Sequence, residues 1–156
     1  ARLDAERAVN RAVRDKDAAG LKAAMIQGGY LPAERAGAVD ADWMLRLMRR
    51  AVGWYARPGF RRFSPDVDRE RHPDRPRPDA AQRAAGKEQV NQFTLPPDAV
   101  LIRRMHGIIA VVMGQLRAGA DWGAIAAEYL HDGPPATELG EAEAAYFTGG
   151  RRAAAR

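Results

Sequence analysis

The residue types that most often bind metals are scarce in this sequence. It contains no cysteine, which excludes disulfides, cysteine nucleophiles and the common Cys-ligated zinc sites. Its three histidines, His72, His106 and His131, are far apart, and none has a second histidine at the spacing that places two ligands on one helix face. Asp66 and Asp68 could touch a divalent ion, but arginines and prolines surround them, which is typical of a solvated loop. We therefore expect no structural metal.

Residues that could cradle a phosphate or attack a substrate are equally few. Gly86-Lys87 resembles the end of a phosphate-binding loop, but Ala81 stands where that loop needs its first glycine, and Glu88 follows in place of Ser or Thr. Ser64 is the only serine, and no histidine lies near it in sequence. The sequence thus assigns no catalytic, cofactor-binding or metal-binding residue to this chain.

The composition favours helices over strands. Alanine is the commonest apolar residue, and it has no side-chain entropy to lose in a helix. The chain has 156 residues, enough for one domain with its own core. We predict an all-α fold in which residues 1–156 form a single helical domain.

The net charge of +5 raises the question of an anionic partner. Seven arginines lie between Arg57 and Arg77, but four acidic residues in the same stretch partly cancel them. Tracts of mixed sign are usually solvated loops. We do not expect a nucleic acid partner, although a basic helical module that binds nucleic acid stays open as an alternative.

No segment has the length of a membrane span. The longest uncharged apolar stretch, Met105 to Leu116, has twelve residues, well short of the roughly 20 that cross a bilayer. A charged start followed by an apolar run and a cleavage site is not visible, so we expect no signal peptide. Together with the absence of cysteine, this predicts a cytoplasmic location, with a peripheral membrane location left open. Because the chain begins at Ala1 and not at a methionine, we expect it to be cut from a longer protein.

Apolar periodicity and capping residues predict a series of helices. They are expected at residues 4–13, 17–28, 40–57, 79–93, 96–117, 121–130 and 137–147. Their predicted N-caps include Asp4, Asp17, Asp40 and Asp121. The first two helices should form a hairpin. Residues 58–79 are predicted to form an irregular excursion rich in proline and arginine, and residues 149–156 a frayed basic tail.

The helix expected after Asp40 has one broad apolar face. The members of this face are Trp43, Met44, Leu47, Met48, Ala51, Val52 and Tyr55. If the face is packed, truncating Leu47 to alanine should cost roughly 2–5 kcal/mol.

The helix expected over residues 98–117 has the strongest pattern. Its apolar side chains cover more than half of the circumference, so we expect one long, nearly encircled helix around which the others assemble. Gly107 and Gly114 lie on the remaining arc with Arg103. They suggest a groove where another helix crosses closely, with simple tolerance of glycine as the alternative. His106, on the polar side, is expected to be a surface or interhelical hydrogen-bond partner.

Two segments carry a resemblance to a known family. The first comprises residues 1–6, 14–21 and 28–31, and the second runs from Leu95 through Gly107 to Leu116 and then Asp121-Trp122. Leu95 and Pro96 open the second segment, and Arg104 and Gly107 form an Arg-Xaa-Xaa-Gly pair within it. Together they resemble the C-terminal helical part of the UbiB/AarF-type atypical protein-kinase-like family, the coenzyme Q biosynthesis kinases among them. The match covers both ends of about residues 1–130, and neither the proline-rich middle nor the tail.

The resemblance implies a helical C-lobe-like segment of a protein-kinase-like fold. The parent chain would be an ATPase or phosphotransferase that binds ATP and magnesium, and this segment would support a site that lies upstream. The nucleotide lysine, the Ala-rich loop, the Lys-Xaa-Gly-Gln element, the catalytic-loop Asp and the Asp-Phe-Gly motif of that family would all precede Ala1, so no catalytic residue is carried over. The expected partner is the upstream kinase-like portion of the same chain, and no cofactor is expected on this segment alone.

Arg104 is predicted to pair with an Asp or Glu from another helix or from the missing portion, because it flanks the apolar arc, where a buried charge needs a partner. A third interpretation, a helical protein-interaction module, would use the glycine-bearing face of the long helix.

Overall fold

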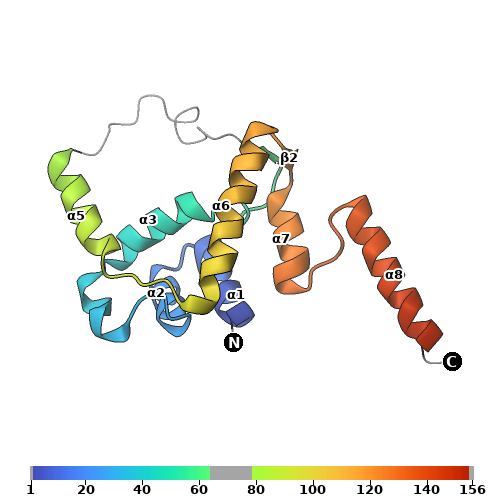
Figure 1. The fold of residues 1–156 in the computed structure, drawn as a ribbon, viewed down its shortest axis with the longest axis horizontal. Coiled ribbons are helices and arrows are strands. Elements are labelled where there is room, and N and C mark those ends of the chain that lie inside the picture. The colour runs from blue at the N-terminus through green and yellow to red at the C-terminus, as the bar shows by residue number, and fades with distance from the viewer. Residues whose placement is uncertain (1, 64–78, 155–156) are drawn as a thin grey trace.

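The described residues fold mostly into helices. The structure, a computed structural model, describes residues 2–63 and 79–154 (Figure 1). In chain order the elements are α1 (Arg2–Asp15), α2 (Ala18–Gln27), the short 3-10 helix η1 (Ala33–Ala38), α3 (Ala41–Ala51), β1 (Arg61–Arg62), α5 (Ala80–Val90), η2 (Pro97–Ala99), α6 (Val100–Gln115), β2 (Gly119–Ala120), α7 (Trp122–His131) and α8 (Glu138–Ala154). The predicted all-α class is confirmed.

Aspartate side chains determine where several helices begin. Asp17, Asp40 and Asp121 each accept a hydrogen bond from the backbone N–H three residues on, at 2.8, 2.6 and 2.9 Å. Such bonds satisfy N–H groups that have no partner inside the helix, and they confirm three predicted N-caps. Asp79 forms a reciprocal capping box at the start of α5. The predicted cap Asp4 is wrong, because α1 begins at Arg2 and Asp4 lies in its first turn.

The hydrophobic core lies between α1, α2 and α3 and the segment that joins the last two. α1 and α2 pack as the predicted hairpin, shown in blue in Figure 1. The largest fully buried side chains are Val13, Leu21, Leu31 and Met44. Of the described residues after position 79, Ala99 alone belongs to this core. The packed centre of the described chain is therefore built by its first 56 residues.

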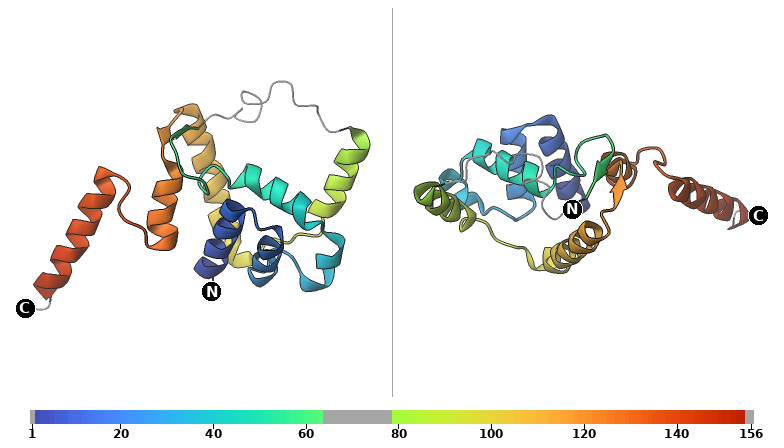
Figure 2. Two further views of the ribbon diagram at one scale, coloured as in Figure 1. Left: turned by 180° about the vertical axis from the view of Figure 1, so that it is seen from behind. Right: turned by 90° about the horizontal axis from the view of Figure 1, so that it is seen from above.

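The predicted role of α6 as one long buried helix is wrong. Leu101 and Ile108 are 68% and 64% exposed, and of the residues of α6 only Gly114 is buried. Arg103, Ala110 and Gly114 turn inward, so the small and polar arc faces the core and the apolar arc faces outward. The reason is that α1, α2 and α3 bury their apolar faces against one another, and no described element covers the outer side of α6 (Figure 2).

The predicted groove on α6 is not filled by the described residues. A Cβ atom added at Gly107 would meet no atom within 4 Å, apart from its chain neighbours and the backbone of its own helix. Glycine at this position is therefore tolerated, and no close crossing of a described helix requires it.

α3 is shorter than predicted and is rotated about its axis. It ends at Ala51, and a turn follows that carries Trp54 and Tyr55. Met44 and Leu45 are buried, whereas Leu47 is 36% exposed. Truncating Leu47 should therefore cost less than the roughly 2–5 kcal/mol typical of a buried leucine.

Two segments far apart in the chain meet beside α7. β1 and β2 pair antiparallel, with Arg61 opposite Ala120 and Arg62 opposite Gly119. Arg61 also donates hydrogen bonds to carbonyl oxygens of the turn after α3, at Trp54 (3.2 Å) and Arg57 (3.1 Å). This guanidinium thus ties β1 to the backbone of the turn that follows α3.

The C-terminal helix lies away from the core and is joined to α7 by a hydrogen bond from the Tyr129 hydroxyl to Glu143 Oε2 (2.8 Å). α8 extends away from the rest of the chain in Figures 1 and 2. It continues to Ala154, so the helix end expected before Gly149-Gly150 is wrong. The described part of the predicted 58–79 excursion includes β1, and the remainder, residues 64–78, lies outside the described residues.

Candidate functional site

A polar cluster joins α6 to the core. Glu6 Oε1 accepts hydrogen bonds from the Tyr30 hydroxyl (2.6 Å) and from Arg103 Nη2 (2.5 Å). Arg103 also donates to the Tyr30 hydroxyl (2.7 Å) and lies over its ring, 5.1 Å from the centroid. The side chains of Arg103 and Glu6 are only 27% and 21% exposed, which weakens screening by water. The cluster therefore fixes the N-terminal half of α6 against α1.

The predicted partner for Arg104 is wrong in the described part of the chain. Arg104 is exposed and has no ion pair with a described residue, whereas its neighbour Arg103 has one. The cause is the inverted orientation of α6, because one residue along a helix turns a side chain by about 100°. The requirement for a carboxylate partner thus applies to Arg103.

Aromatic residues from distant parts of the chain gather where α6, α7 and the turn after α3 meet. The ring of Trp54 makes edge contacts with Tyr55, Phe63 and Trp122, at centroid separations of 4.8, 4.7 and 5.8 Å. The indole N–H of Trp122 donates to the Arg61 carbonyl (2.9 Å). Edge-to-face pairs of this kind are favourable because a ring's positive edge meets a negative face.

A glycine allows α7 to approach this aromatic cluster. A Cβ atom at Gly123 would lie 2.2 Å from the Arg57 carbonyl oxygen, so only glycine permits the observed approach. Asp121 also holds the start of α7 by accepting a hydrogen bond from the Gly59 N–H (2.8 Å). The backbone of the turn after α3 and the start of α7 therefore form one wall.

A cavity of about 320 Å³ opens between α1, α6, α7 and the turn after α3. Its main lining residues are Glu6, Trp54, Tyr55, Ile102, His106 and Trp122. Pockets for small molecules start at about this volume and combine an apolar wall with a few polar groups. We refer to it below as the aromatic pocket.

The Tyr55 hydroxyl, the His106 imidazole and the Trp54 indole N–H line the aromatic pocket and hold no hydrogen bond to a described residue. The rings of Tyr55 and His106 stack, with centroids 6.4 Å apart at an interplanar angle of 26°. Burial raises the pKa of Tyr55 to about 12, so its hydroxyl is protonated at neutral pH and can donate a hydrogen bond. The pocket thus offers an unused donor in an apolar setting.

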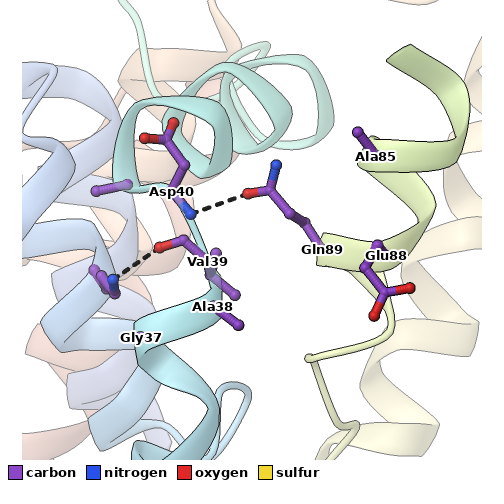
Figure 3. Close-up of a pocket in the computed structure, with 9 residues that line it drawn as sticks. Gly37, Ala38, Val39, Asp40, Ala85, Glu88 and Gln89 are labelled. Atoms are coloured by element: carbon purple, nitrogen blue, oxygen red, sulfur yellow. Dashed lines mark hydrogen bonds between the residues drawn. The ribbon is translucent and has the colours of Figure 1, made fainter. Parts of the chain in front are cut away.

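A second depression lies between α5 and the segment that precedes α3 (Figure 3). It measures about 630 Å³, but its polar groups are used within the fold. Lys22 Nζ donates to the Val39 carbonyl (2.8 Å), and the Asp40 N–H donates to Gln89 Oε1 (3.0 Å). Asp40 also caps α3. These bonds explain how α5 is attached, and of the charged side chains that line the depression only the Glu88 carboxylate holds no bond to a described residue.

The residues weighed for chemistry in the sequence do not meet in the described structure. Gly86-Lys87 lies within α5 and forms no phosphate loop. His106 is exposed and contacts Tyr55, and His131 contacts Asn10 through its Nε2 atom (2.9 Å). Within residues 2–63 and 79–154 no three His, Cys, Asp or Glu side chains are grouped as metal ligands. Ser64, Asp66, Asp68 and His72 lie outside the described residues.

Sequence reasoning missed the aromatic pocket. The available signal was the concentration of aromatic residues between positions 54 and 63, in a chain that is only 7% aromatic. Local periodicity does not link Trp54 with Trp122, because the two residues belong to different elements far apart in the chain.

No known protein family, curated protein or solved structure matches this chain. None of the helices in the described ranges is both long enough and apolar enough to cross a bilayer.

Proposed function

We propose that this chain is the C-terminal helical portion of an atypical kinase-like ATPase or phosphotransferase of the UbiB/AarF type. In this proposal it supports an ATP and magnesium site that lies upstream, in the kinase-like portion of the same protein. The observation that carries the proposal is the uncovered apolar side of α6.

The apolar side of α6 is continuous and regular. Leu101, Met105, Ile108 and Val112 follow one another at intervals of four, three and four residues, the spacing of a seam that packs against another helix. They are 46–68% exposed, from Val112 to Leu101. Contiguous apolar surfaces of this kind mark interaction sites in soluble proteins. We call these four residues the α6 seam and propose that the upstream portion covers it.

The segments that carry the family resemblance also pack together. The Thr94 N–H donates to the Tyr30 carbonyl (2.9 Å), which brings the start of the second segment onto the end of the first. Arg103 and Glu6 then join α6 to α1. Both matched segments therefore form one unit, which supports an origin in one ancestral lobe.

The chemistry assigned to this portion is positional. ATP and magnesium would be held by groups outside residues 1–156, since no phosphate loop occurs in the sequence. A lobe beneath such groups contributes by holding them in place, because an error near 1 Å can reduce a rate about a hundredfold.

The first test is the reading frame upstream of Ala1. The proposal expects it to encode a nucleotide-binding lysine and an Asp-Phe-Gly motif, and expects the full-length product to bind ATP with magnesium. A start codon directly before residue 1, or a full-length product that does not bind ATP with magnesium, would overturn the proposal.

The second test uses matched variants of the full-length product. Ile108→Asp places a charge on the α6 seam, and Leu139→Asp places the same charge on α8, where Leu139 is 76% exposed. If the seam is covered, Ile108→Asp lowers the melting temperature and weakens ATP binding, because an unpaired buried charge is strongly destabilising. Leu139→Asp leaves both unchanged. Identical behaviour of the two variants would contradict the proposal.

A helical protein-interaction module is the second candidate, because the α6 seam suits a separate partner chain equally well. The upstream reading frame discriminates between the two, since this candidate requires no kinase motifs. For the nucleic-acid alternative, two arginines of the basic stretch that begins at Arg57 are engaged within the fold: Arg57 and Arg61 donate hydrogen bonds to backbone carbonyls of the turn after α3.

A further inference from the structure

We propose that the aromatic pocket binds a small, uncharged, planar heteroaromatic molecule whose ring nitrogen or carbonyl oxygen accepts a hydrogen bond from the Tyr55 hydroxyl. This site is independent of the proposed support of an upstream ATP site. It rests on the shape of the cavity, on the rings that line it and on a donor that no described residue uses.

The walls of the pocket select for a flat aromatic ligand. Trp54 makes edge-to-face contacts with Tyr55, at 79°, and with Trp122, at 76°, so the plane of the Trp54 ring is steeply inclined to the planes of the other two. Ile102 from α6 and Ile125 from α7 supply the aliphatic part of the lining. A flat ring system binds most favourably in such a space, because it can stack on the face of one aromatic ring and contact the edge of another. The volume of about 320 Å³ suits one or two fused rings.

The charges around the pocket exclude an anionic ligand. The Glu6 carboxylate lines the pocket. Arg103, the cation that pairs with Glu6, is already bonded to Glu6 and Tyr30 and is not itself a lining residue. An anion would therefore face a carboxylate without a free cation to balance it. An uncharged ligand avoids this repulsion.

The hydroxyl of Tyr55 defines the position of the acceptor. The hydroxyl is not among the enclosed side-chain atoms that lack a partner, so it is reached from the open side of the pocket and a ligand acceptor there would take the place of water. No described residue accepts from Tyr55, although it lines the pocket and is half-buried. A ligand acceptor at this position would satisfy it.

The pocket lies beside the α6 seam and does not coincide with it. Ile102 and His106, the residues of α6 that line the pocket, are not members of the seam. A protein segment packed on the seam therefore leaves the pocket a separate site.

The experiment compares quinoline with naphthalene, two bicyclic probes of the same shape that differ in one ring nitrogen. Binding is followed through the indole N–H signals of the three tryptophans in nitrogen-15-labelled protein. Signals of Trp54 and Trp122 are expected to shift with saturation, whereas Trp43, which packs against Phe93 away from the pocket, stays in place. A probe of about ten non-hydrogen atoms should bind with a Kd in roughly the millimolar to micromolar range.

Quinoline should bind more tightly than naphthalene by about 2–10-fold, which corresponds to one hydrogen bond. Tyr55→Phe removes only the hydroxyl and should make the two probes equal. Ile102→Trp fills the pocket from its exposed side and should abolish binding of both. Its control is Ile109→Trp, at a similarly exposed position of α6 that does not line the pocket, and this variant should bind as the unsubstituted protein does.

Three results would overturn the proposal. The first is the absence of saturable shifts of Trp54 and Trp122 at millimolar quinoline. The second is a preference for quinoline that survives in Tyr55→Phe, and the third is equal loss of binding in Ile102→Trp and Ile109→Trp. None of these results depends on ATP binding, so failure here is distinguishable from failure of the proposed function.

Discussion

The Glu6 carboxylate holds together two elements that are far apart in the chain, and its contribution can be measured. Glu6→Gln preserves the shape of the side chain but removes the negative charge that faces Arg103. Hydrogen bonds to charged groups contribute about 1.5–3 kcal/mol, so we expect a loss of stability of about 1–3 kcal/mol. The measurement is the midpoint of urea denaturation, converted with the slope of the same curve.

The Arg7–Asp132 pair provides the matched control. Asp132 is 82% exposed, and pairs of this kind contribute about 0–1 kcal/mol. Asp132→Asn makes the same type of change, and asparagine tolerates the left-handed backbone at this residue, where φ is 54°. If both variants lose the same free energy of unfolding, the partial burial of Glu6 does not strengthen its ion pair with Arg103.

His131 makes stability depend on pH in a predictable direction. Burial, together with the charges of Arg11, Arg14 and Arg7, lowers the pKa of His131 below its ordinary value, against a smaller opposing effect of Asp132. The unfolded chain therefore takes up the proton more readily than the folded one. The stabilising contribution is complete above the ordinary histidine pKa of about 6.5 and is lost as the pH falls through the lowered value.

His131→Gln tests this prediction, because glutamine does not titrate. Urea midpoints are compared at about pH 7.5 and 5.5, on either side of the ordinary histidine pKa. We expect the unsubstituted protein to lose more stability on acidification than the variant does. Parallel behaviour of the two proteins would remove His131 as a source of the pH dependence.

The packing of α7 and of α6 can be compared through one substitution made in each. Gly123→Ala would place a Cβ atom 2.2 Å from the Arg57 carbonyl oxygen, so α7 must shift, at a cost of about 1–3 kcal/mol. At Gly107 no described neighbour outside its own helix lies within 4 Å of the Cβ position, and alanine there should stabilise by roughly 0.5–1 kcal/mol because it is the better helix former. Melting temperatures of the two variants should therefore move in opposite directions. A gain in both would show that α7 does not approach Arg57 closely.

The positions of the helices could largely be predicted from the sequence, because caps and periodicity are local. Asp17, Asp40 and Asp121 act within three residues, so their role needs no knowledge of the fold. The predicted helix end at residue 57, directly before Pro58, is wrong, because α3 ends six residues earlier, at Ala51. The turn that follows α3 is held by residues far along the chain, such as Asp121 and Trp122, and contacts of this range carry no local signal.

What covers each face could not be predicted in the same way. An apolar arc indicates that a helix prefers to be covered, but not which element covers it, and for α6 no described element does. The aromatic pocket could not be predicted for a related reason, because Trp54, His106 and Trp122 come from three separate elements. Pairings of this range depend on the assembled fold.

The uncovered α6 seam affects how the chain as a whole behaves in solution. Ile108→Asp in the 156-residue chain should change the free energy of unfolding, measured by urea denaturation, by no more than about 0.5 kcal/mol, because Ile108 is 64% exposed there. It should also reduce concentration-dependent self-association, measured by sedimentation velocity, since a charge interrupts the apolar surface. Leu139→Asp is the control for a general effect of added charge. Strong destabilisation by Ile108→Asp alone would mean that the seam is buried in this chain.

The pairing of β1 with β2 has a consequence for the order in which the chain folds. α1, α2 and α3 follow one another closely, so their contacts close short loops and can form early. Pairing of Arg61 with Ala120 closes a loop of more than fifty residues. The chain entropy is lost before the new contacts form, so we expect this step to be slower. In pulse-labelled hydrogen exchange during refolding, amides of α1 and α2 should gain protection before those of α7, and the α7 docking site should be the last part to mature.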